Sequence, residues 1–232
     1  MTVPETDRSD IDTSALDAQR RHWEDAFSKR PQMFGADPSE PGRKAADMFT
    51  AAGVVDVLEL GAGQGRDSHF FIGRGLRVTA LDYTSAAIED LAASAASTAT
   101  AESLQRVQHD VRQPLPFAGQ SFDACYSHML FCMALTTLEL ERLSQEVRRV
   151  LRPGGLHVYT ARTTEDPHYG TGIDRGDQMH EVGGFIVHFF DDELIRRLAS
   201  GFELLEVDAF EESSLPRRLV RVTARRAEGR LQ

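Results

Sequence analysis

The sequence predicts an α/β protein with a mainly parallel sheet. Short, β-rich apolar runs alternate with helical patterns through most of the chain, and such alternation implies right-handed crossovers between parallel strands. The length of 232 residues with 41% hydrophobic content is enough for one sizeable core, whereas two full domains would be cramped. We therefore predict a single domain over residues 1–232.

The N-terminal part has a pattern of its own. Residues 1–12 are charged and small, which predicts disorder. From residue 13, Leu16, Trp23 and Phe27 recur at helical spacing. A loop rich in Pro and Gly follows, and its Pro-Ser-Glu-Pro run is suited to capping a second helix at 44–53. Residues 13–52 are thus predicted to form a helical unit before the α/β body.

The body, from residue 53, contains seven expected strands and four expected helices. The charge runs at 191–198 and 217–226 are interpreted as solvated faces of a helix and a strand. The Ala/Ser/Thr-rich stretch at 92–101 is interpreted as a helix end and linker. The strands are expected at 54–60, 76–82, 104–110, 121–127, 154–162, 202–210 and 217–226, and the helices at 67–75, 85–97, 136–151 and from about 191.

A glycine-rich segment at about 163–187 interrupts the alternation of strands and helices. It is too long for an ordinary connection, and loops of that length in compact domains are usually lids or binding loops. We predict a lid-like insertion, with its glycines as hinges and with His168 and Tyr169 closing over a small acceptor. The spacing of its histidines matches no metal-ligand motif, so no metal is expected.

Composition and charge limit the partners. A formal net charge of −10 argues against a nucleic-acid backbone, because such partners select basic faces. The acidic, polar start does not fit a secretory signal, and no apolar run approaches the length of a membrane span. Cys125 and Cys132 suit reduced thiols in a reducing compartment. These features predict a cytoplasmic protein without a nucleic-acid or membrane partner.

The stretch LELGAGQG at 58–65 indicates a nucleotide-binding turn. A dinucleotide fingerprint, G-x-G-x-x-G, would need its third glycine at position 66, where the chain has Arg66. Gly61 and Gly63 fit that pattern, but Gly65 does not. An NAD-linked oxidoreductase is therefore disfavoured.

The segment ELGAGQG resembles the first motif of the class I S-adenosylmethionine-dependent methyltransferases. Further segments resemble that family in the same order: LRVTALD, VQHDV, QPLPFAGQSFDACYS and EVRRVLRPGGLHVY, so that the resemblance covers about residues 54–160. It implies a Rossmann-like class I methyltransferase fold, with a mainly parallel seven-stranded sheet, helices on both faces and an N-terminal helical cap at 13–52.

The resemblance implies S-adenosylmethionine as cofactor and S-adenosylhomocysteine as product. Asp82 would accept the two ribose hydroxyls in bidentate fashion, a charge-assisted contact, and Asp110 would meet the adenine amino group. Two roles stay open for Glu59, which would either order the glycine loop or contact the cofactor's amino group. Two also stay open for Tyr83, which would either cover the adenine or only pack beneath it. The implied cofactor-binding residues are Glu59, Gly61, Ala62, Gly63, Gly65, Asp82, Tyr83, Asp110, Val111 and Ser127.

The segment after the fourth expected strand, YSHMLFCMAL, borders the transferred methyl group in related enzymes. His128 is the candidate catalytic base, because imidazole titrates near neutrality; hydrogen bonding to the backbone is its alternative role. The front of the chain resembles the N-terminal cap of small-molecule methyltransferases such as the thiopurine and tellurite-resistance groups. The residues expected at the substrate are Trp23, Phe27, Phe34, Met129, Phe131, Cys132, His168 and Tyr169.

The predicted function is methyl transfer from S-adenosylmethionine to a small molecule, by in-line displacement. A thiol or other soft chalcogen acceptor would need little proton chemistry, so that catalysis would rest on alignment and exclusion of water. The alternative acceptors are a hydroxyl, amine or carboxylate of a small metabolite, and protein methylation stays open. From other classes, an NAD-linked oxidoreductase and a non-catalytic nucleotide-binding module are the alternatives. The sequence does not report the oligomeric state.

Overall fold

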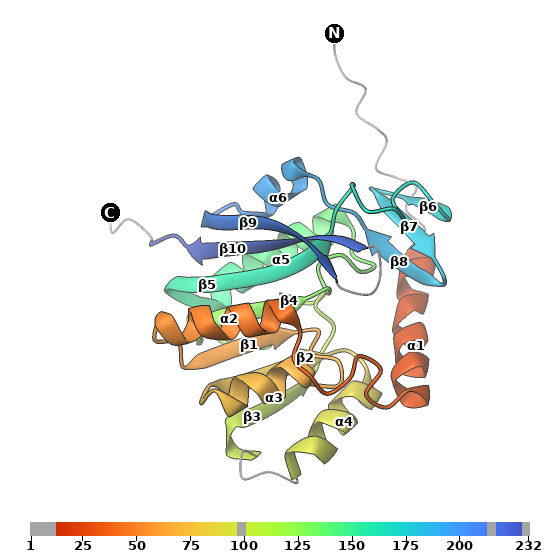
Figure 1. Ribbon diagram of the computed structural model, residues 1–232. Helices are drawn as coiled ribbons and strands as arrows, with labels where there is room; N and C mark the ends of the chain where they lie inside the picture. Colours follow the sequence, from red (N-terminus) through yellow and green to blue (C-terminus); the bar gives the residue numbers. More distant parts are fainter. Residues whose placement is uncertain (1–12, 97–100, 213–216, 229–232) are drawn as a thin grey trace.

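The computed structural model describes residues 13–96, 101–212 and 217–228. The seven expected strands are all present and form one sheet (Figure 1). They are β1 (Asp56–Leu60), β2 (Arg77–Asp82), β3 (Leu104–Gln108), β4 (Phe122–His128), β5 (Leu151–Arg162), β9 (Phe202–Glu212) and β10 (Arg217–Arg226). The predictions for residues 1–12 and for the 97–100 part of the linker lie outside the described residues.

The sheet has the strand order β3-β2-β1-β4-β5-β10-β9. Neighbouring strands from β3 to β5 are parallel, whereas β10 runs antiparallel to both β5 and β9. The mainly parallel sheet predicted from the sequence is therefore confirmed. The antiparallel pair places the β9–β10 hairpin beside the end of β5, a position that matters for the site below.

Helices cover both faces of this sheet, as predicted (Figure 1). One hydrophobic cluster joins Phe49, Phe71 and Leu91 of three helices to the sheet, and a second joins Leu140 and Ile195 of two others. The helices are α1 (Thr13–Lys29), α2 (Glu40–Ala51), α3 (Arg66–Gly73), α4 (Ser85–Ala96), α5 (Thr137–Val150) and α6 (Asp192–Leu198), with a short 3-10 turn, η1 (Ala101–Ser103). Among the described helices, none is both long and apolar enough to cross a bilayer.

The start of α2 differs from the prediction. The helix begins at Glu40 and not at residue 44, because the Ser39 hydroxyl accepts a hydrogen bond from the Gly42 N–H at 2.9 Å. Pro41 is tolerated there since the first turn of a helix needs no donor at that position. The Pro-Ser-Glu-Pro run thus caps the helix as expected, but the second proline lies inside it.

The segment at 163–187 is not the irregular loop that the sequence suggested. It contains most of a three-stranded antiparallel sheet, formed by β6 (Ile173–Gly176), β7 (Met179–Val182) and β8 (Phe185–His188). Gly183 and Gly184 have φ of 61° and 85° and join Val182 to Phe185 in a two-residue hairpin turn. Such turns require positive φ at both central residues, so these two glycines are turn residues and not hinges.

Helix α1 connects this small sheet to the main body (Figure 1). The Glu24 carboxylate accepts hydrogen bonds from Ser85 N, Ser85 Oγ and Ala86 N at the start of α4. The Gln19 amide donates to Gly184 O and accepts from Ile186 N in the β7–β8 hairpin. The predicted N-terminal cap is therefore fixed across one end of the fold by side chains from two of its turns.

Candidate active site

A cavity of about 310 Å³ lies at the ends of β1, β2 and β4, beneath α1. It brings together most of the residues that the sequence predicted. The predicted residues that line it are Trp23, Phe27, Phe34, Glu59, Gly61, Ala62, Gly63, Gly65, Asp82, Tyr83, Asp110, Val111, His128, Met129 and His168. One continuous cavity thus holds the predicted cofactor turn and the predicted base.

The glycine turn between β1 and α3 requires its glycines. Gly61, Gly63 and Gly65 have φ of 69°, 53° and 88°, which other residues rarely adopt. A Cβ at Gly65 would lie 2.3 Å from Cδ2 of Leu91, and one at Gly61 would lie 2.9 Å from Cβ of Leu130. Helix α3 then begins without a side-chain cap. Backbone N–H groups at such a helix start favour a polar or anionic ligand group.

Glu59 is buried at the end of β1 and accepts a hydrogen bond from the Ser68 hydroxyl. Burial, together with the nearby charge of Asp67, raises the pKa of Glu59 well above its usual range. Burial has this effect because it disfavours the charged form of a carboxyl group. Its bond to Ser68 ties β1 to α3, and Glu59 also lines the cavity, so both roles that the sequence left open stay predictions.

Asp82, at the end of β2, is hydrogen bonded to the glycine turn. Its carboxylate accepts hydrogen bonds from Gly63 N at 3.0 Å, Thr84 N at 2.9 Å and Thr84 Oγ1 at 2.8 Å. Any ribose hydroxyl would therefore share this carboxylate with donors of the protein. Burial also raises the pKa of Asp82. The bidentate ribose pairing expected from the sequence stays a prediction for this carboxylate.

Asp110 has a partner within the protein. Arg112 donates to both of its carboxylate oxygens through Nε and Nη2, and Arg112 also reaches Asp17 of α1 at 2.6 Å. Although burial opposes it, Arg112 lowers the pKa of Asp110. An adenine amino group would have to share this carboxylate. Nearby, Nε2 of His109 is buried and makes no hydrogen bond within the described ranges, although His109 lines the cavity.

Aromatic side chains form the wall of the cavity under α1. The Trp23 ring lies 5.3 Å from the ring of Phe27, 6.4 Å from that of Phe34 and 4.9 Å from that of Phe185 in β8, measured between centroids. Tilted contacts at these distances are favourable for aromatic pairs. The small sheet thus contributes to the same apolar wall as the N-terminal cap, a contribution that the sequence did not indicate for Phe185.

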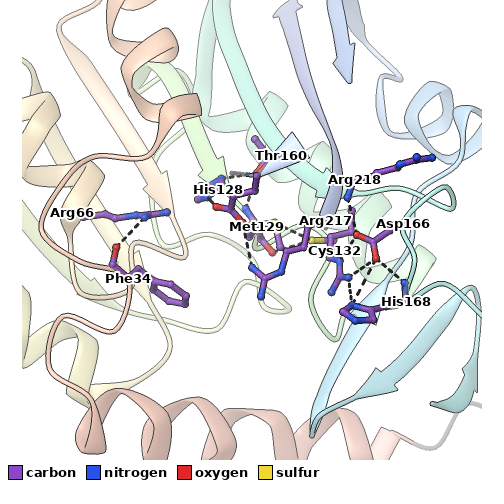
Figure 2. A network of polar contacts seen from close by, with 12 residues as sticks. Phe34, Arg66, His128, Met129, Cys132, Thr160, Asp166, His168, Arg217 and Arg218 are labelled. Carbon is purple, nitrogen blue, oxygen red and sulfur yellow. Dashed lines mark hydrogen bonds and ion pairs between the residues drawn. The ribbon is translucent and has the colours of Figure 1, made fainter. Parts of the chain in front are cut away.

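His128, the last residue of β4, is held between two side chains from distant strands (Figure 2). Its Nδ1 lies 2.8 Å from Oγ1 of Thr160 in β5, and its Nε2 lies 3.6 Å from Oε1 of Glu212 in β9. His128 lowers the pKa of Glu212 to about 2, in spite of burial and with help from Arg217. Glu212 is therefore anionic throughout the physiological range, beside the imidazole.

The residue after His128 has an unusual backbone. Met129 has a φ of 67°, in the left-handed region that a non-glycine residue seldom occupies, at a cost of roughly 1–3 kcal/mol. The Met129 N–H donates to Oγ1 of Thr160 at 3.0 Å. The buried Thr160 hydroxyl therefore fixes both the imidazole and the strained turn that directs it, and both His128 and Met129 line the cavity.

Four predicted site residues do not line the cavity. Cys132 is fully buried and its thiol donates to Met129 O at 3.3 Å; burial raises the pKa of Cys132 to about 11, so a substrate-contacting thiolate is not expected. Phe131 and Ser127 are likewise fully buried, and Phe131 stacks on Tyr159. Tyr169 is exposed and packs against His180 and Phe189. The expected contacts of these four residues with cofactor or substrate stay predictions.

The cavity also contains polar residues that the sequence analysis missed. Arg217 belongs to a charge run interpreted as a solvated face, yet it lines the cavity, and Arg221 of the same strand is buried with only 4% of its side chain exposed. That interpretation was wrong for both. No sequence signal marked these positions, because they depend on strand pairing. The further polar or charged lining residues are Gln19, Gln64, Arg66, Asp67, His109, Arg112, Arg162, Glu212 and Arg217.

The donor set suits the expected cofactor. A turn that excludes side chains at Gly61 and Gly65, an uncapped helix start and an acidic strand end at Asp82 provide space, N–H donors and a hydroxyl acceptor in one cavity. A nucleoside with a polar amino-acid tail needs all three. S-adenosylmethionine therefore fits the residues present.

Comparison with known proteins agrees with this geometry. Residues 57–155 match the family model described as a methyltransferase domain. This range contains the glycine turn, Asp82, Asp110 and His128. A comparison with curated proteins gave no match.

Solved structures similar to this chain share its fold. A 1,6-didemethyltoxoflavin-N1-methyltransferase from Burkholderia thailandensis, with 1,6-didemethyltoxoflavin and S-adenosylhomocysteine bound, is 17% identical, with 98% of this chain and 94% of that chain covered and a TM-score of 0.72. The N-methyltransferase NodS from Bradyrhizobium japonicum WM9, in complex with S-adenosylhomocysteine, is 14% identical, with 91% and 100% covered and a TM-score of 0.69. A SAM-dependent methyltransferase from Methanosarcina mazei is 21% identical, with 75% and 92% covered and a TM-score of 0.65.

Proposed function

We propose that this S-adenosylmethionine-dependent methyltransferase transfers the methyl group to a nitrogen or oxygen atom of a small molecule, with His128 as the base. One observation carries the choice of atom: a histidine held between Thr160 and an ionised Glu212 lines the same cavity as the glycine turn. An amine or hydroxyl must lose a proton as it is methylated, whereas a thiolate does not.

The protein groups then have defined tasks. When bound, S-adenosylmethionine supplies an electrophilic methyl group on a sulfonium. The base form of His128 in this proposal is the neutral tautomer with its proton on Nδ1, toward Thr160, so that Nε2 has the lone pair that takes the proton of the accepting atom. Once protonated, Nε2 donates toward Glu212. Glu212 stabilises the imidazolium that forms, 3.6 Å from Nε2. The apolar wall around Trp23 excludes water and holds the acceptor in line.

One further observation supports a nitrogen or oxygen acceptor. Two of the similar structures are named as N-methyltransferases. The thiol or chalcogen acceptor predicted from the sequence is the competing outcome of the test below.

The proposal includes a cytosolic location and no nucleic-acid partner. The net charge of −10 supports the absence of a nucleic-acid partner, because a polyanion would be repelled. The two free cysteines support a reducing compartment. It also retains the thiopurine- and tellurite-like cap as a prediction for 13–52, supported by the aromatic cluster of Trp23, Phe27 and Phe34.

The test is an acceptor screen with S-adenosylmethionine, in which release of S-adenosylhomocysteine is measured for small amines, phenols, carboxylates, thiols and selenols. We expect turnover with a nitrogen or oxygen acceptor. His128→Ala should lower kcat by about 100-fold or more, the usual contribution of a general base, and leave S-adenosylhomocysteine affinity unchanged. His180→Ala, a histidine outside the cavity lining, is the matched control.

Two results would reject the proposal. If only thiols or selenols are methylated and His128→Ala keeps the full rate, the acceptor is soft and His128 is structural. If His128→Ala and His180→Ala reduce turnover equally, the effect of His128 reflects stability and not proton transfer.

A further inference from the structure

A cluster of hydrogen-bond donors lines the cavity next to His128. Arg162, His168 and Arg217 come from β5, from the segment that follows it and from β10. Figure 2 shows Arg217, Asp166 and His168 grouped on one side of His128 and Met129, with Arg66 and Phe34 on the other side. The proposed methylation does not itself require this cluster.

The first part of the cluster is an ion pair whose carboxylate is buried. Arg162 donates to Asp166 through Nε at 3.1 Å and Nη2 at 2.5 Å, and the Asp166 side chain has no exposed surface. Asp166 also accepts from the backbone N–H groups of His168 and Arg218. Arg162 lines the cavity, whereas Asp166 does not. A ligand at this end therefore meets the guanidinium and not the carboxylate.

The tautomer of His168 follows from its neighbour. Nη2 of Arg162 lies 2.6 Å from Nδ1 of His168. A guanidinium can only donate, so Nδ1 must accept, and the proton of the neutral ring is on Nε2. His168 therefore offers its remaining ring nitrogen as a donor to the cavity that it lines.

Arg217 adds a second cation. Its Nη1 donates to Oε2 of Glu212 at 3.2 Å, and this is the single hydrogen bond of its side chain within the described ranges. Four of its five N–H donors are thus without a protein partner there. Arg162 and Arg217 both line this cavity, and Arg217 contacts Glu212, which is also the carboxylate next to His128. Glu212 is the one carboxylate that lines this end of the cavity in the described residues.

Donors at one end and aromatic rings along the wall define a ligand chemistry. We propose that the methyl acceptor is an apolar or aromatic small molecule with a carboxylate group. Arg217, Arg162 and His168 hold the carboxylate, and Trp23, Phe27 and Phe185 contact the body of the molecule. Its accepting atom then lies at His128. Only the placement of the accepting atom at His128 rests on the proposed function, since binding of the acid does not require turnover.

Matched pairs of acids and amides test the proposal. Anthranilate, salicylate and indole-3-acetate are titrated calorimetrically, each beside its primary amide, into the full-length protein saturated with S-adenosylhomocysteine. The two members of a pair differ only in charge at one group. We expect at least one acid to bind about tenfold or more tightly than its amide, because charge-assisted hydrogen bonds are the stronger ones.

Variants locate the effect. Arg217→Gln should reduce the preference for the acid to less than about threefold. Arg218→Gln is the matched control, since Arg218 is the next residue of β10, lies outside the cavity lining and is half exposed; it should keep the preference. Because Arg217 also pairs with Glu212, His168→Ala serves as a second variant that removes a donor without breaking that pair, and it should also weaken binding of the acid.

Each outcome bears on one hypothesis. Equal binding of acids and amides, no binding of any acid to the S-adenosylhomocysteine complex, or an unchanged preference in Arg217→Gln would overturn the carboxylate site. Absence of S-adenosylhomocysteine binding would reject the proposed function instead. Acid binding without methylation of any acceptor would support the carboxylate site and reject the proposed function.

Discussion

Asp82 provides the sharpest test of the cofactor site. Asp82→Asn keeps the shape of the side chain but removes its charge, and it leaves at most a neutral hydrogen bond to a ribose hydroxyl. A charge-assisted hydrogen bond contributes about 1.5–3 kcal/mol, and each 1.4 kcal/mol is a factor of about ten in Kd. Because the neutral hydrogen bond that remains still contributes about 0.5–1.5 kcal/mol, the net loss is about 1–1.5 kcal/mol, and we expect affinity for S-adenosylhomocysteine to fall by about 5- to 12-fold.

Calorimetric titration with S-adenosylhomocysteine measures this effect, and the thermal midpoint of each variant reports on the glycine turn. Thr84→Val is the matched control, because it removes one hydrogen bond to the same carboxylate without changing its charge, and Thr84 is fully buried. We expect Thr84→Val to lower Tm while its Kd stays within about threefold of wild type. If Asp82→Asn also stays within threefold, or if Thr84→Val weakens binding as much, Asp82 acts through the fold and not through the ribose.

Two further variants test the turn and the core. Gly65→Ala should weaken S-adenosylhomocysteine binding at least about tenfold and lower Tm, because its Cβ would meet Leu91 at 2.3 Å. Gly75→Ala, with a similar φ of 84° and open space, should cost about 1 kcal/mol or more of stability from backbone strain alone and leave Kd unchanged. An equal loss of affinity in both variants would refute the role of the contact with Leu91. Burial lowers the pKa of His157 to about 3 from an ordinary 6.5. Between these two pH values the folded state binds fewer protons than the unfolded chain. The stability that the neutral His157 contributes is therefore lost as pH falls. Relative to His157→Phe, denaturant titrations of wild type should lose about 2 kcal/mol between pH 7 and pH 5; parallel stability curves would contradict this.

The cofactor side of the site was predictable because its determinants are local. Gly61, Gly63 and Gly65 are contiguous with the strand they follow, and Asp82 ends the next strand along the chain. Adjacent parallel strands bring such strand ends together without further information. What the sequence did not indicate was how these groups are used within the fold: Asp82 is largely occupied by Gly63 and Thr84, and the neighbouring Asp110 by Arg112.

The substrate side was less predictable because it is assembled across the sheet. Glu212 is the last residue of β9 and Arg217 is the first of β10, and their pairing depends on the register of these two strands. In a strand, adjacent side chains point to opposite faces, so Arg217 lines the cavity while Arg218 does not. A charge run carries no mark of this difference. The strands of the insertion were not predicted for a related reason, since glycines such as Gly183 serve hairpin turns as readily as hinges.

One carboxylate links the two halves of the proposed chemistry. Glu212 contacts His128 at 3.6 Å and Arg217 at 3.2 Å, so Glu212→Gln would disturb both the base and the proposed carboxylate site. Its effect on kcat/KM therefore has no single cause, and residues that share a partner are not additive. Two double-mutant cycles separate the roles. We expect coupling of Glu212 with His128 in kcat, and coupling of Glu212 with Arg217 in the ratio of the Kd values for acid and amide. Coupling found in the same quantity for both pairs would mean that the hairpin acts as a structural unit and not as two functional contacts.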